Sequence, residues 1–449
     1  MLKMNKGFSL IVSKKIKEHK KTISIDSDKS ISIRSFLIGA ISHNISEIKN
    51  VLESEDVLST ISCLKKLGVK IKKIKPKHYL VFGKGLGSLH AKKGLVLNCG
   101  NSGTLSRLLI GILSTTPNIN VKITGDASLR KRNMSKLINL MSEFGAEFEK
   151  NKSKFPINFT SSDMPVGITY ESGVSAQLKS AVMLAGLNSF GTTTVIEKKY
   201  KSRDHTENIL LKSPKVLKVQ KNIIQIFGKN YLNPLKLIVP GDPSAAAFFC
   251  AITLLTKNSY LKIKNVGLNP KRIGFYKLLK SYGGKIQFKN IKKTNNEIVG
   301  DVHVRSSKLK PIRARADFYP STADEYPILF VIAAFISGVS TFKGISDLSN
   351  KESSRANEMK KILNQIGIKC KLNKNEMKIY GKNKIKKINK TIKLKKLNDH
   401  RLCMSMFCIS AITGIKSYIK SFDTVFTSSP SFLKIIKSIG GKFEIKKIS

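Results

Sequence analysis

Apolar and polar positions along the chain repeat in a regular order. One recurring pattern is the end of an amphipathic helix, then glycine, then the alternation of apolar and polar residues that is typical of a strand. Five copies carry the glycine, at Gly68, Gly145, Gly283, Gly367 and Gly440. The interval between Gly145 and Gly283 is roughly twice the others, and ILLKSPKVLKV, with Pro214 in place of glycine, lies within it. We therefore predict six copies.

A second pattern alternates with the first and consists of a polar turn that opens an apolar helix. Its six copies read DKSISIRSFLIGAI, NSGTLSRLLIGIL, SAQLKSAVMLAGL, GDPSAAAFFCAITLL, ADEYPILFVIAAF and NDHRLCMSMFCISAI. These segments are apolar around their whole circumference, which predicts buried helices. Together the two patterns predict six strand–helix–strand–helix units, which form either a solenoid or two globular halves of three units divided near Pro240.

The polar turns raise a question about chemistry. The N-terminus of a helix exposes backbone N–H groups and the positive end of the helix dipole, so it attracts either an anion or a capping side chain. In the turn NSGT, the capping residue would be Ser102 or Thr104. If the six helices pack in parallel, their turns face one cleft that suits a small ligand with several negative charges. The residues that would face this cleft are Lys29, Ser30, Asn101, Thr104, Ser175, Gln177, Asp324 and Arg401.

The distribution of arginine supports a ligand at these turns. Only 11 of the 81 basic residues are arginine, and the others are lysine. In such a chain an arginine indicates a position that needs a planar, permanently charged side chain. Seven of the arginines lie in or beside the polar clusters: Arg34, Arg107, Arg130, Arg132, Arg203, Arg355 and Arg401.

Length and hydropathy narrow the class of protein. A chain of 449 residues exceeds one ordinary core, which predicts two or three domains, and its 41% hydrophobic content is typical of a globular protein. The longest apolar run, Pro327 to Val339, is shorter than the ~20 residues of a membrane-spanning helix. The first residues, MLKMNKGFSLIVSKK, contain too short an apolar stretch for a signal peptide. We therefore predict a cytoplasmic protein with no membrane partner.

The spacing of the cysteines argues against a zinc protein, and the distribution of the basic residues argues against a nucleic-acid-binding protein. The six cysteines are scattered without a CxxC pair, which predicts reduced thiols and no zinc site. The formal net charge of +52 at first suggests a nucleic-acid partner. However, the basic residues are spread along the chain, as in IKKIKPKH, KNIKKTNN and KIKKINKTIKLKK, and do not gather in one patch. We predict no nucleic-acid partner.

Nine short motifs occur in order across nearly the whole chain: DKSIS, NSGT, GDASLRKR, SAQLKSA, SRDHTE, VPGD, ADEYP, KESSR and DHRLCMS. Together they resemble the 5-enolpyruvylshikimate-3-phosphate (EPSP) synthase family. The resemblance implies an α/β fold, a two-domain inside-out α/β barrel in which each domain has three repeated α/β units with buried helices. It implies one domain of residues 27–239 and a discontinuous second domain of residues 1–26 and 240–449, with the active site in the cleft between them.

The resemblance also implies the reaction. Phosphoenolpyruvate would donate its enolpyruvyl group to the 5-hydroxyl of shikimate 3-phosphate, without a metal or organic cofactor, in a monomer whose two domains open and close. One alternative is UDP-N-acetylglucosamine enolpyruvyltransferase, which shares the fold and the donor. It would be expected to carry a KN pair where this chain has Lys29 and Ser30, and a catalytic cysteine in a loop. A second alternative is a non-catalytic, basic nucleic-acid-binding protein.

Substrate contacts are implied residue by residue. Both substrates carry a phosphate and a carboxylate, which arginine, lysine and helix N-termini bind well. The implied contacts to shikimate 3-phosphate are Lys29, Ser30, Arg34, Ser175, Ala176, Gln177, Arg203, Asp324 and Lys351. The implied contacts to phosphoenolpyruvate are Lys29, Gly103, Arg132, Gln177, Arg355 and Arg401.

The implied chemistry needs a base and an acid. The 5-hydroxyl attacks C2 of the enol while C3 is protonated, and phosphate then leaves. By resemblance Asp324 is the base and Glu352 the proton donor, with Lys29 as the competing candidate for the donor. The structural alternatives are that Asp324 is a first-turn acid that stabilises the helix dipole, and that Arg355 is a surface residue.

Some residues in the motifs have a structural interpretation, or depart from the family pattern. His205 and His400 are expected to form structural hydrogen bonds, and Arg107 and Arg130 are either ligand contacts or structural ion-pair partners. Ala176 stands where some members have serine. Thr427 stands where some have a lysine that binds phosphoenolpyruvate.

Overall fold

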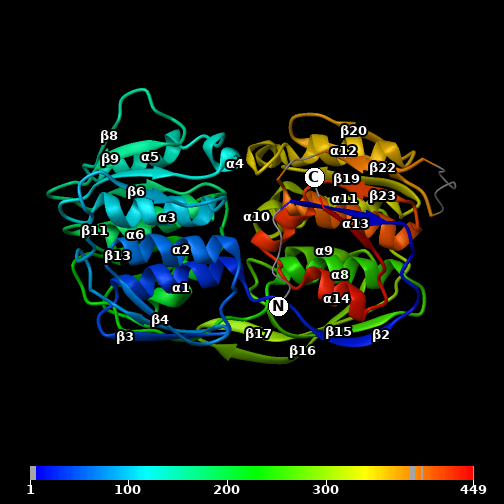
Figure 1. Cartoon of the computed structure of the whole chain (residues 1–449), viewed down its shortest axis with the longest axis horizontal. Coiled ribbons are helices and arrows are strands. Elements are labelled where there is room, and N and C mark those ends of the chain that lie inside the picture. The colour runs from blue at the N-terminus through cyan, green and yellow to red at the C-terminus, as the bar shows by residue number, and fades with distance from the viewer. Residues whose placement is uncertain (1–6, 384–389, 396–397, 448–449) are drawn as a thin grey trace. The chain divides into compact units, whose positions relative to one another are not determined.

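The computed structural model describes residues 7–383, 390–395 and 398–447 (Figure 1). Residues 1–6, which the resemblance assigns to the second domain, and most of the basic segment 384–396 lie outside the described residues. Contacts along the chain separate two compact units. Unit 1 comprises Met1–Asp26, Gly241–Lys292 and Ile298–Ser449, and unit 2 comprises Ser27–Pro240 together with Lys293–Glu297.

Within the described residues, six four-stranded sheets share one strand order, in which two parallel strands are followed by a strand antiparallel to the second. In unit 2, the first sheet has the strand order β14 (Lys236–Ile238), β3 (Ile45–Lys49), β5 (His78–Phe82) and β4 (Lys70–Lys75). The second has the order β6 (Leu95–Asn98), β7 (Asn120–Thr124), β9 (Ile157–Thr160) and β8 (Glu147–Phe148). The third has the order β10 (Thr169–Glu171), β11 (Thr192–Ile196), β13 (Ile223–Phe227) and β12 (Leu217–Gln220). In unit 1, the first sheet has the strand order β2 (Lys20–Ser24), β15 (Tyr260–Gly267), β17 (Glu297–Arg305) and β16 (Lys285–Thr294). The second has the order β18 (Arg313–Ala314), β19 (Gly338–Lys343), β21 (Glu376–Gly381) and β20 (Lys369–Leu372). The third has the order β22 (Ile392–Leu394), β23 (Ser417–Ile419), β1 (Phe8–Val12) and β24 (Glu444–Lys447).

The six apolar segments form the buried helices that the sequence predicts. They are α1 (Lys29–Ile41), α3 (Gly103–Ser114) and α6 (Ala176–Gly186) in unit 2, and α8 (Pro243–Leu255), α11 (Tyr326–Ala334) and α13 (His400–Thr413) in unit 1. In unit 2, α3 packs against both α1 and α6 (Figure 1). A Cβ at Gly111 would lie 2.5 Å from the carbonyl oxygen of Ala181, so α3 and α6 approach this closely only because position 111 is glycine.

More exposed helices carry the other repeated pattern. These are α2 (Glu55–Lys66), α5 (Ser135–Glu143), α7 (His205–Leu210), α9 (Gly274–Ser281), α12 (Arg355–Gln365) and α14 (Phe432–Ser438). The glycine that follows each of five has a φ between +73° and +95°, the left-handed conformation that ends helices. After α7 the chain turns through Ser213 and Pro214 into β12, which confirms the predicted sixth copy.

The remaining short elements connect these repeats. They are α4 (Ala127–Arg130), α10 (Tyr319–Thr322), and the 3-10 turns η1 (Ala316–Phe318), η2 (Ser346–Asn350) and η3 (Phe422–Thr427).

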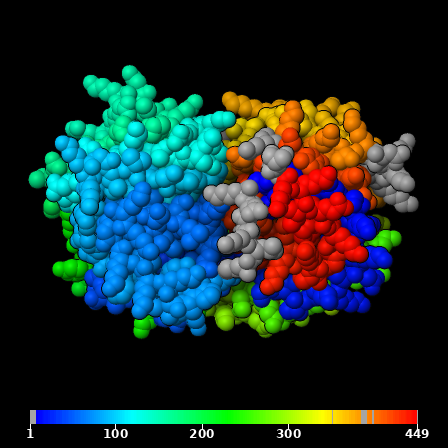
Figure 2. All heavy atoms as spheres, in the orientation of Figure 1, coloured from blue at the N-terminus to red at the C-terminus, as the bar shows by residue number. Residues whose placement is uncertain are grey.

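The N-terminal strands belong to unit 1, although most of that unit follows residue 240. β1 pairs antiparallel with both β23 and β24, and β2 pairs parallel with β15. Figure 2 accordingly shows N-terminal atoms (blue) beside C-terminal atoms (red) on this unit. Two sheets of unit 1 are therefore completed by strands that lie more than 200 residues from their partners in the sequence.

One short segment belongs to a different unit from the one that the resemblance implies. Lys293–Glu297, at the turn between β16 and β17, groups with unit 2. Asn295 Nδ2 donates to the carbonyl oxygen of Lys236 at 2.7 Å, and its Oδ1 accepts from the backbone N–H of Ile238 at 3.0 Å. These bonds attach the turn to β14, an interaction that no local sequence pattern indicates.

All six cysteines are free thiols and buried. Within the described ranges, no helix is long and apolar enough to cross a membrane. In the same ranges, no group of three or more His, Cys, Asp or Glu side chains is arranged to hold a metal ion.

Candidate functional site

The buried helices of unit 2 begin with side-chain caps. Asp28 Oδ1 accepts from Ile31 N at 2.8 Å, Ser102 Oγ from Leu105 N at 3.1 Å, and Ser175 Oγ from Leu178 N at 3.4 Å. Ser102 is therefore the capping residue of the NSGT turn. Each cap satisfies one backbone donor, and the positive end of the helix dipole remains at each turn.

Lys29 is the first residue of α1, and its side chain is 18% exposed. Its Nζ lies 2.9 Å from Oδ2 of Asp56, a buried carboxylate in the first turn of α2. The ion pair holds the lysine beside the N-terminus of α1. Ser30 follows on the same turn, and its carbonyl oxygen accepts from Arg34 Nη1 at 3.1 Å.

The NSGT turn and the start of α6 are joined by side-chain hydrogen bonds. Arg107 Nη1 donates to Gln177 Oε1 at 2.9 Å, and Gln177 Nε2 donates to Thr104 Oγ1 at 3.0 Å. Arg132 Nη2 donates to Asn101 Oδ1 at 2.8 Å. Two arginines and one glutamine are thus fixed around the N-terminus of α3.

Gly103 occupies a position where a side chain would meet both of these arginines. A Cβ there would lie 2.6 Å from Arg132 Nη1 and 2.7 Å from Arg107 Nη1. The absence of a side chain lets the two guanidinium groups converge over the first turn of α3. Two converging guanidinium groups at a helix N-terminus form a favourable anion site.

Arg34 connects three elements from a buried position. Its Nε donates to Thr206 Oγ1 at 2.9 Å and its Nη2 to Ser180 Oγ at 3.1 Å, so it links α1 to α7 and α6. Its direct contact with shikimate 3-phosphate stays a prediction. Arg203, also predicted to contact that substrate, lies partly exposed just before α7.

Lys179, in the SAQLKSA motif on α6, is fully buried between two carboxylates. Its Nζ lies 2.5 Å from Glu207 Oε1 and 2.9 Å from Glu197 Oε1. Burial alone would lower the pKa of Lys179, but the charges of Glu207 and Glu197 outweigh it and raise the pKa. Glu197 Oε1 also accepts from Ser202 N at 2.8 Å, so the triad anchors the segment that leads into Arg203.

His205 is structural, as expected. Its Nδ1 lies 2.7 Å from Glu297 Oε1, and Asn208 Nδ2 donates to the same oxygen at 3.1 Å. The histidine is 3% exposed.

In unit 1, Asp324 lies between two arginines. Its Oδ1 is 3.5 Å from Arg355 Nη1, and its Oδ2 is 3.5 Å from Arg272 Nη1. The Asp324 side chain is 26% exposed, whereas Arg355 is 1% exposed. The carboxylate of Asp324 is therefore partly open to solvent and lies between two guanidinium groups.

Arg355 is the centre of a carboxylate cluster and not a surface residue. Its Nε donates to Asp399 Oδ2 at 3.0 Å, and its Nη2 donates to Glu352 Oε2 at 2.5 Å. Burial would lower its pKa, but Asp399, Glu352 and Asp324 outweigh burial and raise it. The interpretation of Arg355 as an exposed surface residue is therefore wrong.

Lys351 precedes α12, and Arg401 lies at the start of α13. Lys351 Nζ is 2.8 Å from Asp347 Oδ2, and the OH of Tyr319 donates to the same oxygen at 2.8 Å. Arg401 is buried in the first turn of α13, which Asp399 caps by accepting from Arg401 N at 3.0 Å. Thr427 Oγ1, at the end of η3, donates to the carbonyl oxygen of Thr424 at 2.8 Å.

Several residues of these clusters were not identified from the sequence. They are Asp56, Lys179, Glu197, Glu207, Asp242, Arg272 and Asp399, and most of them are partners of predicted residues. Arg272 carried a usable signal, because arginine is rare in this chain. The carboxylates carried none, since each lies far in sequence from its partner or resembles an ordinary helix cap.

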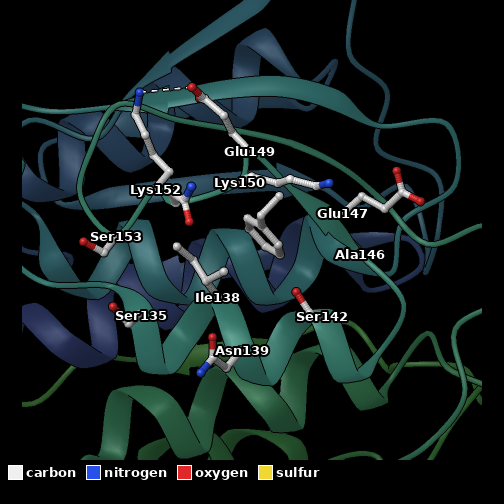
Figure 3. A pocket seen from close by; sticks show the side chains of 12 residues that line it. Ser135, Ile138, Asn139, Ser142, Ala146, Glu147, Glu149, Lys150, Lys152 and Ser153 are labelled. Carbon is white, nitrogen blue, oxygen red and sulfur yellow. Dashed lines mark hydrogen bonds and ion pairs between the residues drawn. The ribbon is translucent and has the colours of Figure 1, made fainter.

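A separate hollow of about 700 Å³ lies between α5 and residues 146–153 (Figure 3). Ser135, Ile138 and Ser142 form one wall, and the Glu149–Lys152 ion pair spans part of the other. None of the predicted site residues lines it.

Known proteins resemble the chain along nearly its whole length. The family model for EPSP synthase (3-phosphoshikimate 1-carboxyvinyltransferase) matches residues 13–436. The 3-phosphoshikimate 1-carboxyvinyltransferase of Paramagnetospirillum magneticum is 36% identical over 425 residues, 93% of this chain and 94% of that protein. The enzyme of Petrotoga mobilis is 38% identical over 422 residues, 93% of this chain and 96% of that protein.

Solved structures also resemble the chain along nearly its whole length. EPSP synthase from Acinetobacter baumannii superposes with a TM-score of 0.84 at 32% identity and covers 99% of this chain and 100% of that one. The enolpyruvyl transferase NikO from Streptomyces tendae has a TM-score of 0.76 at 12% identity, over 99% of this chain and 100% of that one, a likeness of fold alone. The chain is a member of the EPSP synthase (3-phosphoshikimate 1-carboxyvinyltransferase) family.

Proposed function

We propose that this protein transfers the enolpyruvyl group of phosphoenolpyruvate to the 5-hydroxyl of shikimate 3-phosphate, giving EPSP and phosphate in the shikimate pathway. The observation that carries the proposal is membership of the family from residue 13 to residue 436. The side chains also match the charge of the substrates, because arginines and a lysine gather at helix N-termini in both units. The proposal excludes the sugar-nucleotide transferase and the nucleic-acid-binding alternatives.

The proposed contacts divide between the two substrates. Phosphoenolpyruvate is proposed to bind Lys29, Gly103, Arg132, Gln177, Arg355 and Arg401. Shikimate 3-phosphate is proposed to bind Lys29, Ser30, Arg34, Ser175, Ala176, Gln177, Arg203, Asp324 and Lys351. Support comes from the guanidinium pair that converges over Gly103 and from the ordered turn that precedes Arg203.

The proposed reaction is addition followed by elimination. Asp324 accepts the proton of the 5-hydroxyl as its oxygen bonds to C2 of phosphoenolpyruvate, and the electron pair of the enol double bond takes a proton at C3. Loss of a proton from C3 then reforms the double bond as the bond between C2 and the phosphate oxygen breaks and phosphate leaves. Glu352 or Lys29 delivers and removes the C3 proton. The two arginines beside Asp324 favour its ionised form before the hydroxyl proton arrives.

We further propose that the enzyme acts in the cytoplasm as a monomer, with no metal, organic cofactor or nucleic-acid partner. Its six free, buried thiols suit a reducing compartment. The reaction transfers no electrons to or from the substrates, so it requires no redox group.

Phosphate release by the purified protein tests the function. Phosphoenolpyruvate is supplied with shikimate 3-phosphate in one assay and with UDP-N-acetylglucosamine in another. We expect phosphate release with shikimate 3-phosphate alone. Release with the sugar nucleotide would instead identify a different acceptor, and no release with either would contradict a catalytic role.

Replacing Gly103 with alanine should raise the KM for phosphoenolpyruvate about ten- to a hundredfold, because the added Cβ displaces the guanidinium groups of Arg107 and Arg132 from their present positions. Folding should change little, since only the mobile ends of long side chains must move. Initial rates at varied phosphoenolpyruvate measure the effect. The matched control is Gly39→Ala in the interior of α1, where the new Cβ meets Ser46 at 3.3 Å. An equal rise of KM in both variants would refute the guanidinium explanation.

A further inference from the structure

Charged side chains of alternating sign form a chain across the helix N-termini of unit 1. Asp242 caps α8, and its Oδ1 lies 3.1 Å from Arg272 Nη2. Arg272 Nη1 lies 3.5 Å from Asp324 Oδ2, and Asp324 Oδ1 lies 3.5 Å from Arg355 Nη1. Arg355 in turn pairs with Glu352 and Asp399. The carboxylate of Asp324 thus faces one arginine on each side.

The two arginines have different surroundings. Arg355 is shared among three carboxylates and is proposed to bind phosphoenolpyruvate, whose negative charges would offset part of its attraction for Asp324. Arg272 lies on the other side, 3% exposed, and its Nη2 also donates to Ser244 Oγ at 3.1 Å. Asp242 is itself fixed, because its Oδ1 accepts from Ser244 N at 2.8 Å. The guanidinium of Arg272 is therefore held in place by the start of α8.

We infer that Arg272 is a positioning residue for the proposed base, Asp324. It orients the carboxylate from its Oδ2 side and keeps that carboxylate ionised when phosphoenolpyruvate occupies Arg355. The inference rests on the proposed function, and it assigns Arg272 no contact with either substrate.

Other titratable groups near Asp324 do not replace this charge. Tyr319 lies close to Asp324, but burial and the neighbouring Asp347 raise the pKa of its phenol, so the phenol stays neutral near pH 7. Lys351 is paired with Asp347. Glu325, the next residue, is buried and accepts a hydrogen bond from Ser244 Oγ. Arg272 and Arg355 each place a guanidinium nitrogen 3.5 Å from the carboxylate of Asp324.

The test compares Arg272→Met and Arg272→Lys with the wild type. In Arg272→Met, we expect the acid limb of the kcat/KM profile for shikimate 3-phosphate to move upward by about one pH unit or more, because a cation within 4 Å no longer favours the ionised base. Arg272→Lys, which keeps the charge, should restore most of the shift. The Kd for shikimate 3-phosphate alone should change less than about threefold, because a substitution that does not touch the ligand has only a small effect on its binding.

Two further variants separate positioning from folding. Arg305→Met removes an exposed arginine of the same unit and should leave the profile unchanged. Arg272→Met combined with Asp242→Asn removes the carboxylate that the single change would leave buried and unpaired, and should show the same shift in a more stable protein.

The outcomes are distinct. A wild-type pH profile in Arg272→Met, with only a loss of thermal stability, would reduce Arg272 to a structural residue and overturn the inference. A wild-type protein that releases no phosphate would remove the proposed function, and the inference would fail with it. An upward shift that lysine reverses supports the inference.

Discussion

Asp324→Asn should lower kcat by about a hundred- to ten-thousandfold, the usual contribution of a positioned general base. The amide keeps the shape of the side chain but does not accept the hydroxyl proton. Binding of shikimate 3-phosphate should persist, because the proposed phosphate contacts lie on other residues. Single-turnover phosphate release and calorimetric titration with shikimate 3-phosphate measure the two effects separately.

A matched change checks that this loss is chemical. Asp347→Asn alters a carboxylate of the same unit that pairs with Lys351 and Tyr319 and is not assigned a proton transfer. It should leave kcat within about tenfold of the wild type. If Asp324→Asn also kept kcat within tenfold, Asp324 would not be the base, and Glu352 or Lys29 would have to take both proton transfers.

Lys179→Met should cost about 3–5 kcal/mol of the free energy of unfolding, because it leaves the carboxylates of Glu197 and Glu207 buried without their cation. The pKa of Lys179 is raised in the folded protein, so its contribution is complete at neutral pH and is lost only as the pH rises through that raised value. Urea unfolding at pH 7 measures the effect.

The control uses an exposed ion pair of the same unit. Lys198 lies 2.6 Å from Glu171, with 63% of the lysine side chain exposed. Lys198→Met should change stability by less than about 1 kcal/mol, as is usual for exposed pairs. Similar losses in both variants would mean that burial does not decide the cost. The triple change Lys179→Met, Glu197→Gln and Glu207→Gln should recover part of the loss, since no charge of this triad then remains.

The repeated architecture was predictable because it is written locally. Each buried helix is apolar on all faces, and each helix-ending glycine stands at a fixed place in its unit, so a short window contains the whole signal. The strand that completes each unit was harder to anticipate. In the sheet of β22 and β23 that strand is β1, from the opposite end of the chain, and no window holds both partners.

The candidate site divides in the same way. Gly103, Arg132 and Gln177 were recognised because their motifs are contiguous, and the structure places them together at two neighbouring helix starts. Arg272, just before α9, and Asp324, just after α10, are 52 positions apart in the sequence, and they lie close together where α9 packs against α10. Burial, which decides the character of Arg355 and Lys179, also depends on the whole fold.

The position of β1 and β2 sets an order of events during synthesis. Unit 2 draws nearly all its residues from one continuous stretch and can form as soon as Pro240 has left the ribosome. The FSLIV strand is translated before Ser417–Ile419 and Glu444–Lys447, with which it pairs, and must wait for them. For most of that time its apolar side chains and backbone have no partner. A strand that waits this long for its partners is exposed to misassociation during synthesis.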